Sequence, residues 1–185
     1  THTLCTFTAP AALTLASTDT SIRVLVVTGE GRAFCPGADL KHFTSGETDE
    51  RLDAKHFRVT TLFHTIPAVT VAAINGACAG AGLGWALTCD LRVAAASAKF
   101  NTAFLEVGIA GDMGGPWTLA RIVGPAKARE LYMLPDKFGA VDAFRIGLVS
   151  QVFEDDMFRG EVGTIVDRLA AAAPIGLKTL KANFV

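Results

Sequence analysis

Two glycine-containing stretches could bring backbone N–H groups close to a bound substrate. Residues 75–90 read NGACAGAGLGWALTCD, with four glycines from Gly76 to Gly84, and residues 37–39 read GAD. We expect each stretch to begin a helix directly after a strand and a glycine turn, where the first N–H groups lack intrahelical partners. Such donors, with the positive end of the helix dipole, stabilise a developing oxyanion. For each stretch alone, close helix packing through glycine is the alternative explanation.

Asp112 is the carboxylate best suited to acid–base chemistry. It lies in AGDMGG (110–115), where its neighbours are small or apolar, among them Ile109 and Met113. Apolar surroundings raise the pKa of a carboxyl group, which helps it to accept and return a proton near neutral pH. The alternative is that Asp112 caps the helix that follows, because Asp is a favoured N-cap residue.

The elements that must position these residues alternate along the chain. Apolar, β-branched runs predict three buried strands, at 24–28, 68–74 and 91–96. Spacing and breakers predict helices at about 52–64, 80–89, 115–123, from Pro125, within 140–147, at 161–173 and from Pro174. Residues 29–40, GEGRAFCPGADL, form a turn-rich connection in this prediction. The predicted fold class is therefore α/β.

Composition excludes several classes of partner. The 185 residues carry a net charge of −1, and no cluster of Lys or Arg indicates binding to nucleic acid or to an anionic membrane. Residues 59–89 contain no Asp, Glu, Lys or Arg, but Asn75-Gly76 divides this segment into two short pieces, so we expect no membrane insertion. An apolar content of 50% is high, and it favours burial in a homo-oligomer interface.

The cysteines show no spacing typical of a metal site or a disulfide framework. Cys5, Cys35, Cys78 and Cys89 are scattered, with no C-x-x-C spacing and no partner histidine at the spacing of a metal site. We interpret them as free thiols of a cytoplasmic protein, with no metal. Cys35 is a poor candidate nucleophile because no partner histidine lies near it in the sequence.

Taken together, the motifs resemble those of the crotonase family, the enoyl-CoA hydratase/isomerase superfamily. The stretches that carry the resemblance are TGEGRAFCPGADL (28–40), AAINGACAGAGLGWALTCDLRVAAASAKF (72–100), GDMGG (111–115), LARIVGPAKARELYM (119–133) and GLVSQVF (147–153). The resemblance implies a spiral of ββα units, assembled as a homotrimer or a hexamer. It also implies that the substrate is an acyl-CoA thioester, with no further cofactor.

The resemblance assigns an oxyanion hole and its surroundings. The thioester carbonyl would lie between the N–H groups of Ala38 and Ala81. Substrate-binding positions would be Gly37, Gly80 and Gly82, with Leu83 and Phe104 beside the acyl group, although core packing explains the last two equally well.

The acids of the family's hydratases are absent from their positions here. Those enzymes carry two glutamates, at the places that Gly84 and Phe104 occupy in this sequence. Some double-bond isomerases and a dehalogenase of the family have a catalytic Asp in the loop that holds Asp112. We therefore expect double-bond isomerisation with Asp112 as the proton shuttle. The alternatives are a hydratase that uses Glu106, Asp112 as nucleophile or base in hydrolysis, dehalogenation or decarboxylation, and a non-catalytic acyl-CoA-binding protein.

The two ends depart from the family pattern. No first strand of the family is recognisable in residues 1–17, and KTLKANFV (178–185) comes before the place where the family pattern has its terminal helices, so we expect the true chain to be longer. We expect residues 1–160 to form a crotonase-like core with an incomplete N-terminal part. Residues 161–185 would begin a truncated C-terminal helical region.

Overall fold

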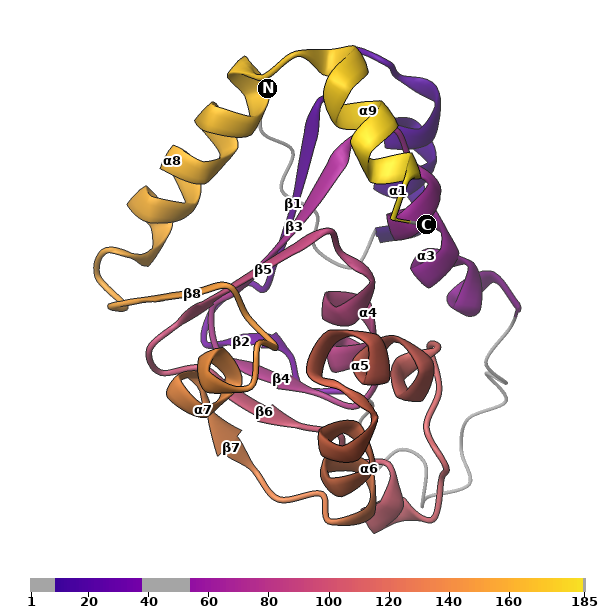
Figure 1. Ribbon diagram of the computed structural model, residues 1–185, viewed down its shortest axis with the longest axis vertical. Coiled ribbons are helices and arrows are strands. Elements are labelled where there is room, and N and C mark those ends of the chain that lie inside the picture. Colours follow the sequence, from indigo (N-terminus) through magenta and orange to yellow (C-terminus); the bar gives the residue numbers. More distant parts are fainter. Residues whose placement is uncertain (1–8, 38–53, 185) are drawn as a thin grey trace.

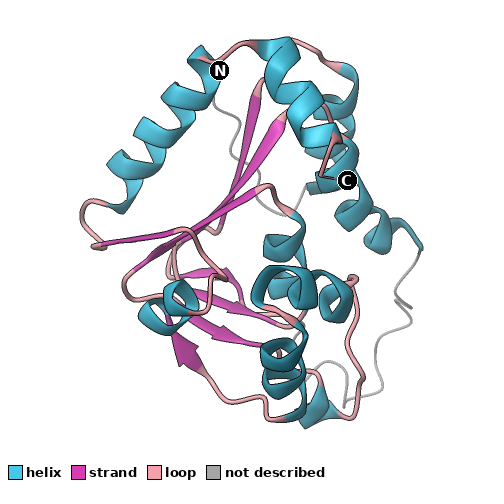
Figure 2. Ribbon diagram, in the orientation of Figure 1, coloured by secondary structure: helices cyan, strands magenta, loops and turns pink. Residues whose placement is uncertain are grey.

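The computed structural model describes residues 9–37 and 54–184, which contain two four-stranded sheets with helices around them (Figure 1, Figure 2). The first sheet has the order β1-β3-β5-β8 and is parallel, with strands Val24–Thr28, Val69–Ile74, Leu91–Ala95 and Gln151–Phe153. The second has the order β2-β4-β6-β7, with strands Ala33–Cys35, Ala77–Ala79, Lys99–Asn101 and Phe138–Gly139. Only the β6–β7 pair of the second sheet is antiparallel. The α/β prediction is confirmed.

The described helices are α1 (Ala9–Thr18), α3 (Ala54–Thr65), α4 (Ala81–Thr88), α5 (Gly115–Val123), α6 (Pro125–Met133), α7 (Ala140–Arg145), α8 (Phe158–Ala171) and α9 (Pro174–Ala182). A short 3₁₀ helix, η1, spans Leu105–Val107. Among the described residues, no helix is long and apolar enough to cross a membrane. Residues 59–89 instead divide into α3, β3, β4 and α4, as the break at Asn75-Gly76 predicts.

The first sheet is covered on both faces, which explains its continuous apolar strands. All six residues of β3 are buried. Val71 and Ala73 belong to a cluster with three residues of α8, namely Phe158, Val162 and Val166. Ala72 and Ile74 point to the main core, to which α1, α3 and α4 contribute. In Figure 1, α8 accordingly lies on one side of this sheet, and α1, α3 and α9 lie on the other.

Each long strand of the first sheet leads through a sharp turn into a short strand of the second sheet. The side chain of Asn75 holds two of these turns together: its Oδ1 accepts a hydrogen bond from the N–H of Gly29 at 2.9 Å, and its Nδ2 donates to the carbonyl of Gly31 at 3.0 Å. A Cβ on Gly76 would collide with the carbonyl oxygen of Arg32, so the turn requires glycine. Strand, turn, short strand and helix therefore repeat as stacked ββα units.

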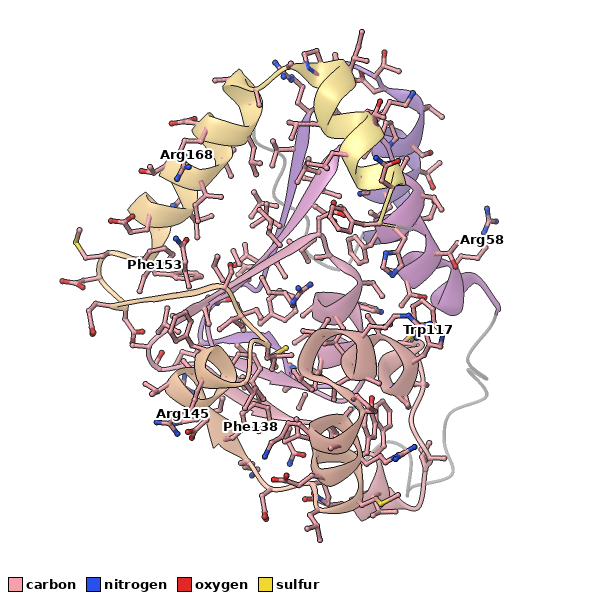
Figure 3. The ribbon with its side chains drawn as sticks, viewed as in Figure 1. Arg58, Trp117, Phe138, Arg145, Phe153 and Arg168 are labelled. Carbon is pink, nitrogen blue, oxygen red and sulfur yellow. The ribbon has the colours of Figure 1, made fainter. Side chains whose placement is uncertain are left out.

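The second sheet corrects part of the sequence prediction. Residues 29–40 are not only a turn-rich connection, because Ala33–Cys35 within them forms β2. Strands β4 and β7 were not predicted either, and they have three and two residues. Such segments are too short to show a period-2 pattern, and only pairing with neighbours defines them. Phe138 of β7 stacks on Phe100 of β6, with ring centroids 5.5 Å apart (Figure 3).

A buried lysine attaches α9 to the core. The Lys181 Nζ donates to the carbonyls of Phe63 at 2.9 Å and Ala68 at 2.8 Å, and it forms an ion pair with Asp90 Oδ2 at 2.8 Å. The same Asp90 oxygen accepts the N–H and hydroxyl of Thr70, at 2.7 Å and 2.9 Å. All three lysine donors are therefore satisfied, which makes its burial tolerable.

Candidate active site

The N-terminus of α4 is where the structure places the predicted donor Ala81. Ala81 is the first residue of α4, so its N–H has no acceptor within the helix. Gly80 precedes it with φ 52° and ψ −125°, a conformation that favours glycine, and the N–H of Gly80 donates to the carbonyl of Asn101 at 3.1 Å. The glycine thus turns the chain from β4 into α4 and leaves the Ala81 N–H at the helix end.

The second predicted element lies directly beside the first. Gly37 has φ 94°, and a Cβ on this residue would lie 3.2 Å from the carbonyl oxygen of Ala79 and 3.9 Å from the Cα of Gly80. Ala38 itself lies outside the described residues, so its role as the second donor stays a prediction. The structure nevertheless brings the start of GAD and the start of α4 into backbone contact, although 43 positions separate Gly37 from Gly80.

Asp112 is half-buried and does not cap a helix. The N-cap of α5 is Gly114, with no side-chain hydrogen bond to the helix. The backbone carbonyl of Asp112, not its carboxylate, accepts the N–H of Gly115 at 2.8 Å. Its Oδ1 is buried without a hydrogen-bond partner among the described residues. Burial raises the pKa of this carboxyl above its ordinary value, as the apolar neighbours predict.

The loop that carries Asp112 packs against α4 at Gly84. A Cβ on Gly84 would lie 2.6 Å from the Cβ of Met113, and Met113 is buried with φ 50°. The position that holds a glutamate in the hydratases therefore has no room for a side chain here. The absence of a side chain at Gly84 is what allows the Asp112 loop to lie on α4, one helical turn from Ala81.

The remaining predicted site residues lie around this point. Phe104 is buried, and its ζ carbon would be 3.9 Å from a Cβ on Gly80, which places the ring beside the turn into α4. Gly82 packs against Cys35, whose Sγ would be 2.8 Å from an added Cβ. Leu83 is buried in the main core. Glu106, the alternative acid, is exposed on η1.

Tyr132 of α6 was missed by sequence reasoning. Its ring lies against Gly111, and its hydroxyl lies against Gly115, so the ring touches both ends of the segment that contains Asp112. Burial and the charge of Asp112 raise the pKa of Tyr132 well above its usual range, so the phenol remains protonated. It lies within LARIVGPAKARELYM (119–133), one of the stretches that carry the family resemblance, and it is the single tyrosine of the sequence, but no role was predicted for it.

A separate cavity of about 790 Å³ is lined by residues of α3, α4, α5 and α9, among others. Its lining includes His64, Trp117, Arg121 and Leu180, and none of the predicted site residues. The guanidinium of Arg121 lies 3.4 Å from the centre of the ring of Trp117, which is labelled in Figure 3. This cavity is therefore distinct from the space around Asp112.

The thiols of the described residues agree with the sequence analysis. Cys35, Cys78 and Cys89 are free. Burial raises the pKa of Cys89 to about 12 and also raises that of Cys78 well above its ordinary value, so both remain protonated. Within residues 9–37 and 54–184, no group of three His, Cys, Asp or Glu could hold a metal ion.

Comparison with known proteins places this arrangement in a family. The family described as enoyl-CoA hydratase/isomerase matches residues 4–185. The chain is 38% identical over 180 residues to 4-chlorobenzoyl coenzyme A dehalogenase-1 of an Arthrobacter species, covering 93% of this chain and 64% of that protein. It is 34% identical over 169 residues to the 1,2-epoxyphenylacetyl-CoA isomerase of Escherichia coli, covering 88% of this chain and again 64% of the relative.

Solved structures agree with the sequence relatives. The enoyl-CoA hydratase of Bacillus anthracis superimposes with a TM-score of 0.88 at 30% identity, covering 94% of this chain and 69% of that chain. The chain thus spans about two thirds of the length of the proteins that it resembles. By family match, sequence and fold, it belongs to the enoyl-CoA hydratase/isomerase family, the crotonase superfamily.

Proposed function

We propose that the protein shifts a carbon–carbon double bond of an acyl-CoA thioester through an enolate, with Asp112 as the proton shuttle. The carboxylate of Asp112 takes a proton from C4 or C2 of the acyl chain. The electron pair moves onto the thioester oxygen, which accepts hydrogen bonds from the N–H groups of Ala81 and Ala38. Asp112 then returns the proton at the other carbon, so no atom is gained or lost. No cofactor besides the thioester substrate is required.

The observation that carries this proposal is the environment of Asp112. Its Oδ1 is buried without a partner, and its pKa is raised by burial. A carboxyl group whose pKa is closer to neutrality takes up and releases a proton more evenly than an exposed one. The loop that carries it packs on α4 through Met113 and Gly84, which brings it to the helix whose first N–H group is that of Ala81. Each oxyanion donor contributes on the order of 3 kcal/mol to transition-state stabilisation.

The experiment is deuterium exchange from heavy water into a panel of enoyl- and acyl-CoA thioesters, followed by mass spectrometry. We expect exchange and double-bond migration with the unchanged protein, and loss of both in Asp112→Asn. Glu106→Gln is the matched control, because Glu106 is an exposed acid of the neighbouring 3₁₀ helix. Exchange that persists in Asp112→Asn would overturn the proposal.

The same panel separates the other functions. Formation of 3-hydroxyacyl-CoA that is lost in Glu106→Gln would indicate a hydratase. Binding of CoA thioesters without exchange on any of them would indicate a binding protein. Both results contradict Asp112 as a proton shuttle.

A second candidate function is supported by the similarity to 4-chlorobenzoyl coenzyme A dehalogenase-1. In that case a carboxylate oxygen of Asp112 would attack the carbon that bears the halogen. Halide would leave with the bonding electron pair, and water would hydrolyse the resulting ester to a hydroxyaryl product. Both routes begin from the ionised carboxylate, so the raised pKa of Asp112 does not separate them. Chloride release from 4-chlorobenzoyl-CoA, measured with an ion-selective electrode, distinguishes the two.

A further inference from the structure

We propose that the Tyr132 hydroxyl is the hydrogen-bond donor that holds the ionised Asp112 carboxylate, directly or through one water, and so sets the pH at which the site works. Tyr132 would be a positioning residue, because it acts through Asp112 and not on the substrate. This inference deepens the proposed function and rests on it for its catalytic meaning. The hydrogen bond between Tyr132 and Asp112 can nevertheless be tested without measuring turnover.

The first observation is the fit of the tyrosine ring to the Asp112 loop. Its Cε1 would lie 3.1 Å from a Cβ on Gly111, and its Cζ 3.6 Å from a Cβ on Gly115, with the hydroxyl oxygen closer still. A side chain at either Gly111 or Gly115 would push the tyrosine ring away, so the two glycines allow the ring to approach the loop. Asp112 lies between these two contacts, and its carbonyl is bonded to the N–H of Gly115. The hydroxyl is thus fixed beside the segment that carries the carboxylate.

The second observation is an acceptor without a donor. Asp112 Oδ1 is buried and has no hydrogen-bond partner among the described residues. A buried carboxylate oxygen without a donor is strongly destabilised when it ionises. Tyr132 and Asp112 interact electrostatically, and the pKa of Tyr132 is raised, so the phenol keeps its proton to donate. No hydrogen bond joins Tyr132 to Asp112 Oδ1 in this structure, and the bond would form when Asp112 ionises.

The other charged groups around the loop offer no equivalent donor. Helix α4 carries no titratable side chain, and η1 contributes only the exposed acid Glu106. On α5, Arg121 is stacked on Trp117. On α6, Lys127 is paired with Glu130 at 2.7 Å, and Arg129 is exposed. Helix α4 also carries Trp85, whose indole Nε1 is a buried donor without a partner among the described residues. Of these two donors, Tyr132 is the one whose ring lies against Gly111 and Gly115, on either side of Asp112.

The direct test is the titration of Asp112 by carboxyl-carbon NMR, assigned by its loss in Asp112→Asn. A donor to the ionised form lowers the pKa of a carboxyl group, so Tyr132→Phe should raise it by about one unit. Phe keeps the ring between Gly111 and Gly115. The matched control, Thr164→Val, removes an exposed hydroxyl from the distant helix α8 and should leave the titration unchanged. An unchanged titration in Tyr132→Phe overturns the inference.

A second readout avoids any variant of Tyr132. Because the sequence has a single tyrosine, growth on 3-fluorotyrosine labels this position alone. We expect its fluorine resonance to shift with the titration of Asp112 and to lose that shift in Asp112→Asn. A resonance that does not follow Asp112 contradicts the inference, even if Tyr132→Phe should fail to fold.

The catalytic readout is the pH profile of deuterium exchange. In Tyr132→Phe the acidic limb should move about one unit higher, and the lost rate should return at higher pH. A uniform loss at every pH would indicate a structural effect and would overturn the inference. If the unchanged protein exchanges no thioester, the proposed function fails, and the two NMR titrations still decide the role of Tyr132.

Discussion

At the scale of single residues, the candidate site consists of small features that depend on one another. Gly84 has no side chain, so Met113 can lie against α4, and Asp112 is thereby held near the helix start. The burial that raises the pKa of Asp112 also makes its ionised form unfavourable in the folded protein. Active-site residues often lower the stability of the folded protein. The features described above have two measurable consequences.

The first consequence concerns Asp112 and pH. The pKa of its carboxyl is raised from 3.8 in the folded protein, so the folded state binds this proton more tightly than the unfolded state. Its contribution to stability is therefore fully present below about pH 3.8 and is lost as pH rises through the folded-state pKa. Asp112→Asn has no such loss. We expect the Tm of Asp112→Asn to exceed that of the unchanged protein increasingly as pH rises, as scanning calorimetry would show. A Tm difference that is constant with pH would contradict a raised pKa.

The second consequence concerns Gly84. An added methyl group would meet the Met113 Cβ at 2.6 Å, and overpacking of this kind typically costs about 1–3 kcal/mol. That exceeds the gain of roughly 1 kcal/mol from replacing a helical glycine by alanine. We expect Gly84→Ala to lower the free energy of unfolding in urea and to reduce deuterium exchange at least tenfold (about 1.4 kcal/mol), since Asp112 moves with Met113.

Gly160→Ala is the matched control for Gly84→Ala. Gly160 also lies within a helix, but nothing would lie within 4 Å of its added Cβ. This variant should be more stable by roughly 0.5–1 kcal/mol, with unchanged exchange. Equal effects of the two substitutions would show that the Asp112 loop is not packed on α4.

At the scale of elements, helix α9 depends on contacts that its own sequence does not reveal. Helix α9 has mostly exposed residues, and its buried position is a charged one, Lys181. The lysine spans from α9 to the end of α3 and the start of β3, through the carbonyls of Phe63 and Ala68. A polar contact therefore fixes the place of a helix that apolar contacts alone hold weakly.

Substitution of Lys181 tests this role. Lys181→Met keeps the length of the side chain but leaves Asp90 and two carbonyls without this donor. Removing one partner of a buried pair costs about 3–5 kcal/mol, and we expect the lower end because Asp90 keeps its bonds to Thr70 and is partly exposed. Urea unfolding measures the loss.

The control on the same helix is Lys178→Met, because Lys178 is exposed. Its effect should stay within about 0.5 kcal/mol. A loss in Lys181→Met no larger than that would show that α9 does not depend on the buried lysine.

At the scale of the whole molecule, the two sheets have different roles. The first sheet is covered on both faces and carries the core, while the turns and short strands of the second lead to Gly37, Gly80 and the start of α4. Several large apolar side chains remain exposed on the described surface, including Trp117, Phe144, Ile175 and Phe184. Scattered side chains of this kind also occur on monomers, so the expected oligomer rests on the family resemblance.

We therefore expect the protein to form a homotrimer or a hexamer. Light scattering coupled to size-exclusion chromatography should give three or six times the chain mass at micromolar concentration. A monomer that stays soluble and active in deuterium exchange would contradict this expectation.

Much of the fold could be predicted from local patterns. The strands at Val24–Thr28, Val69–Ile74 and Leu91–Ala95 are apolar and β-branched because both faces of their sheet are buried, and that leaves a continuous signal. Proline and glycine likewise mark the bounds of α5 and α6. The motifs around Gly37 and Gly80 predicted the family, which the comparisons confirmed.

Tertiary structure alone decided the rest, because it concerns contacts between distant segments. Strands of two or three residues such as β2, β4 and β7 have no pattern of their own and exist through pairing. Asp112 could be singled out as a titratable group among apolar neighbours, but only packing showed that it does not cap α5. Tyr132 of α6 lies against residues 111–115 because the glycines there leave space for its ring, and no local sequence pattern reveals this contact. Sequence thus determined which residues could do chemistry, and the packing of loops on α4 determined which of them lie together.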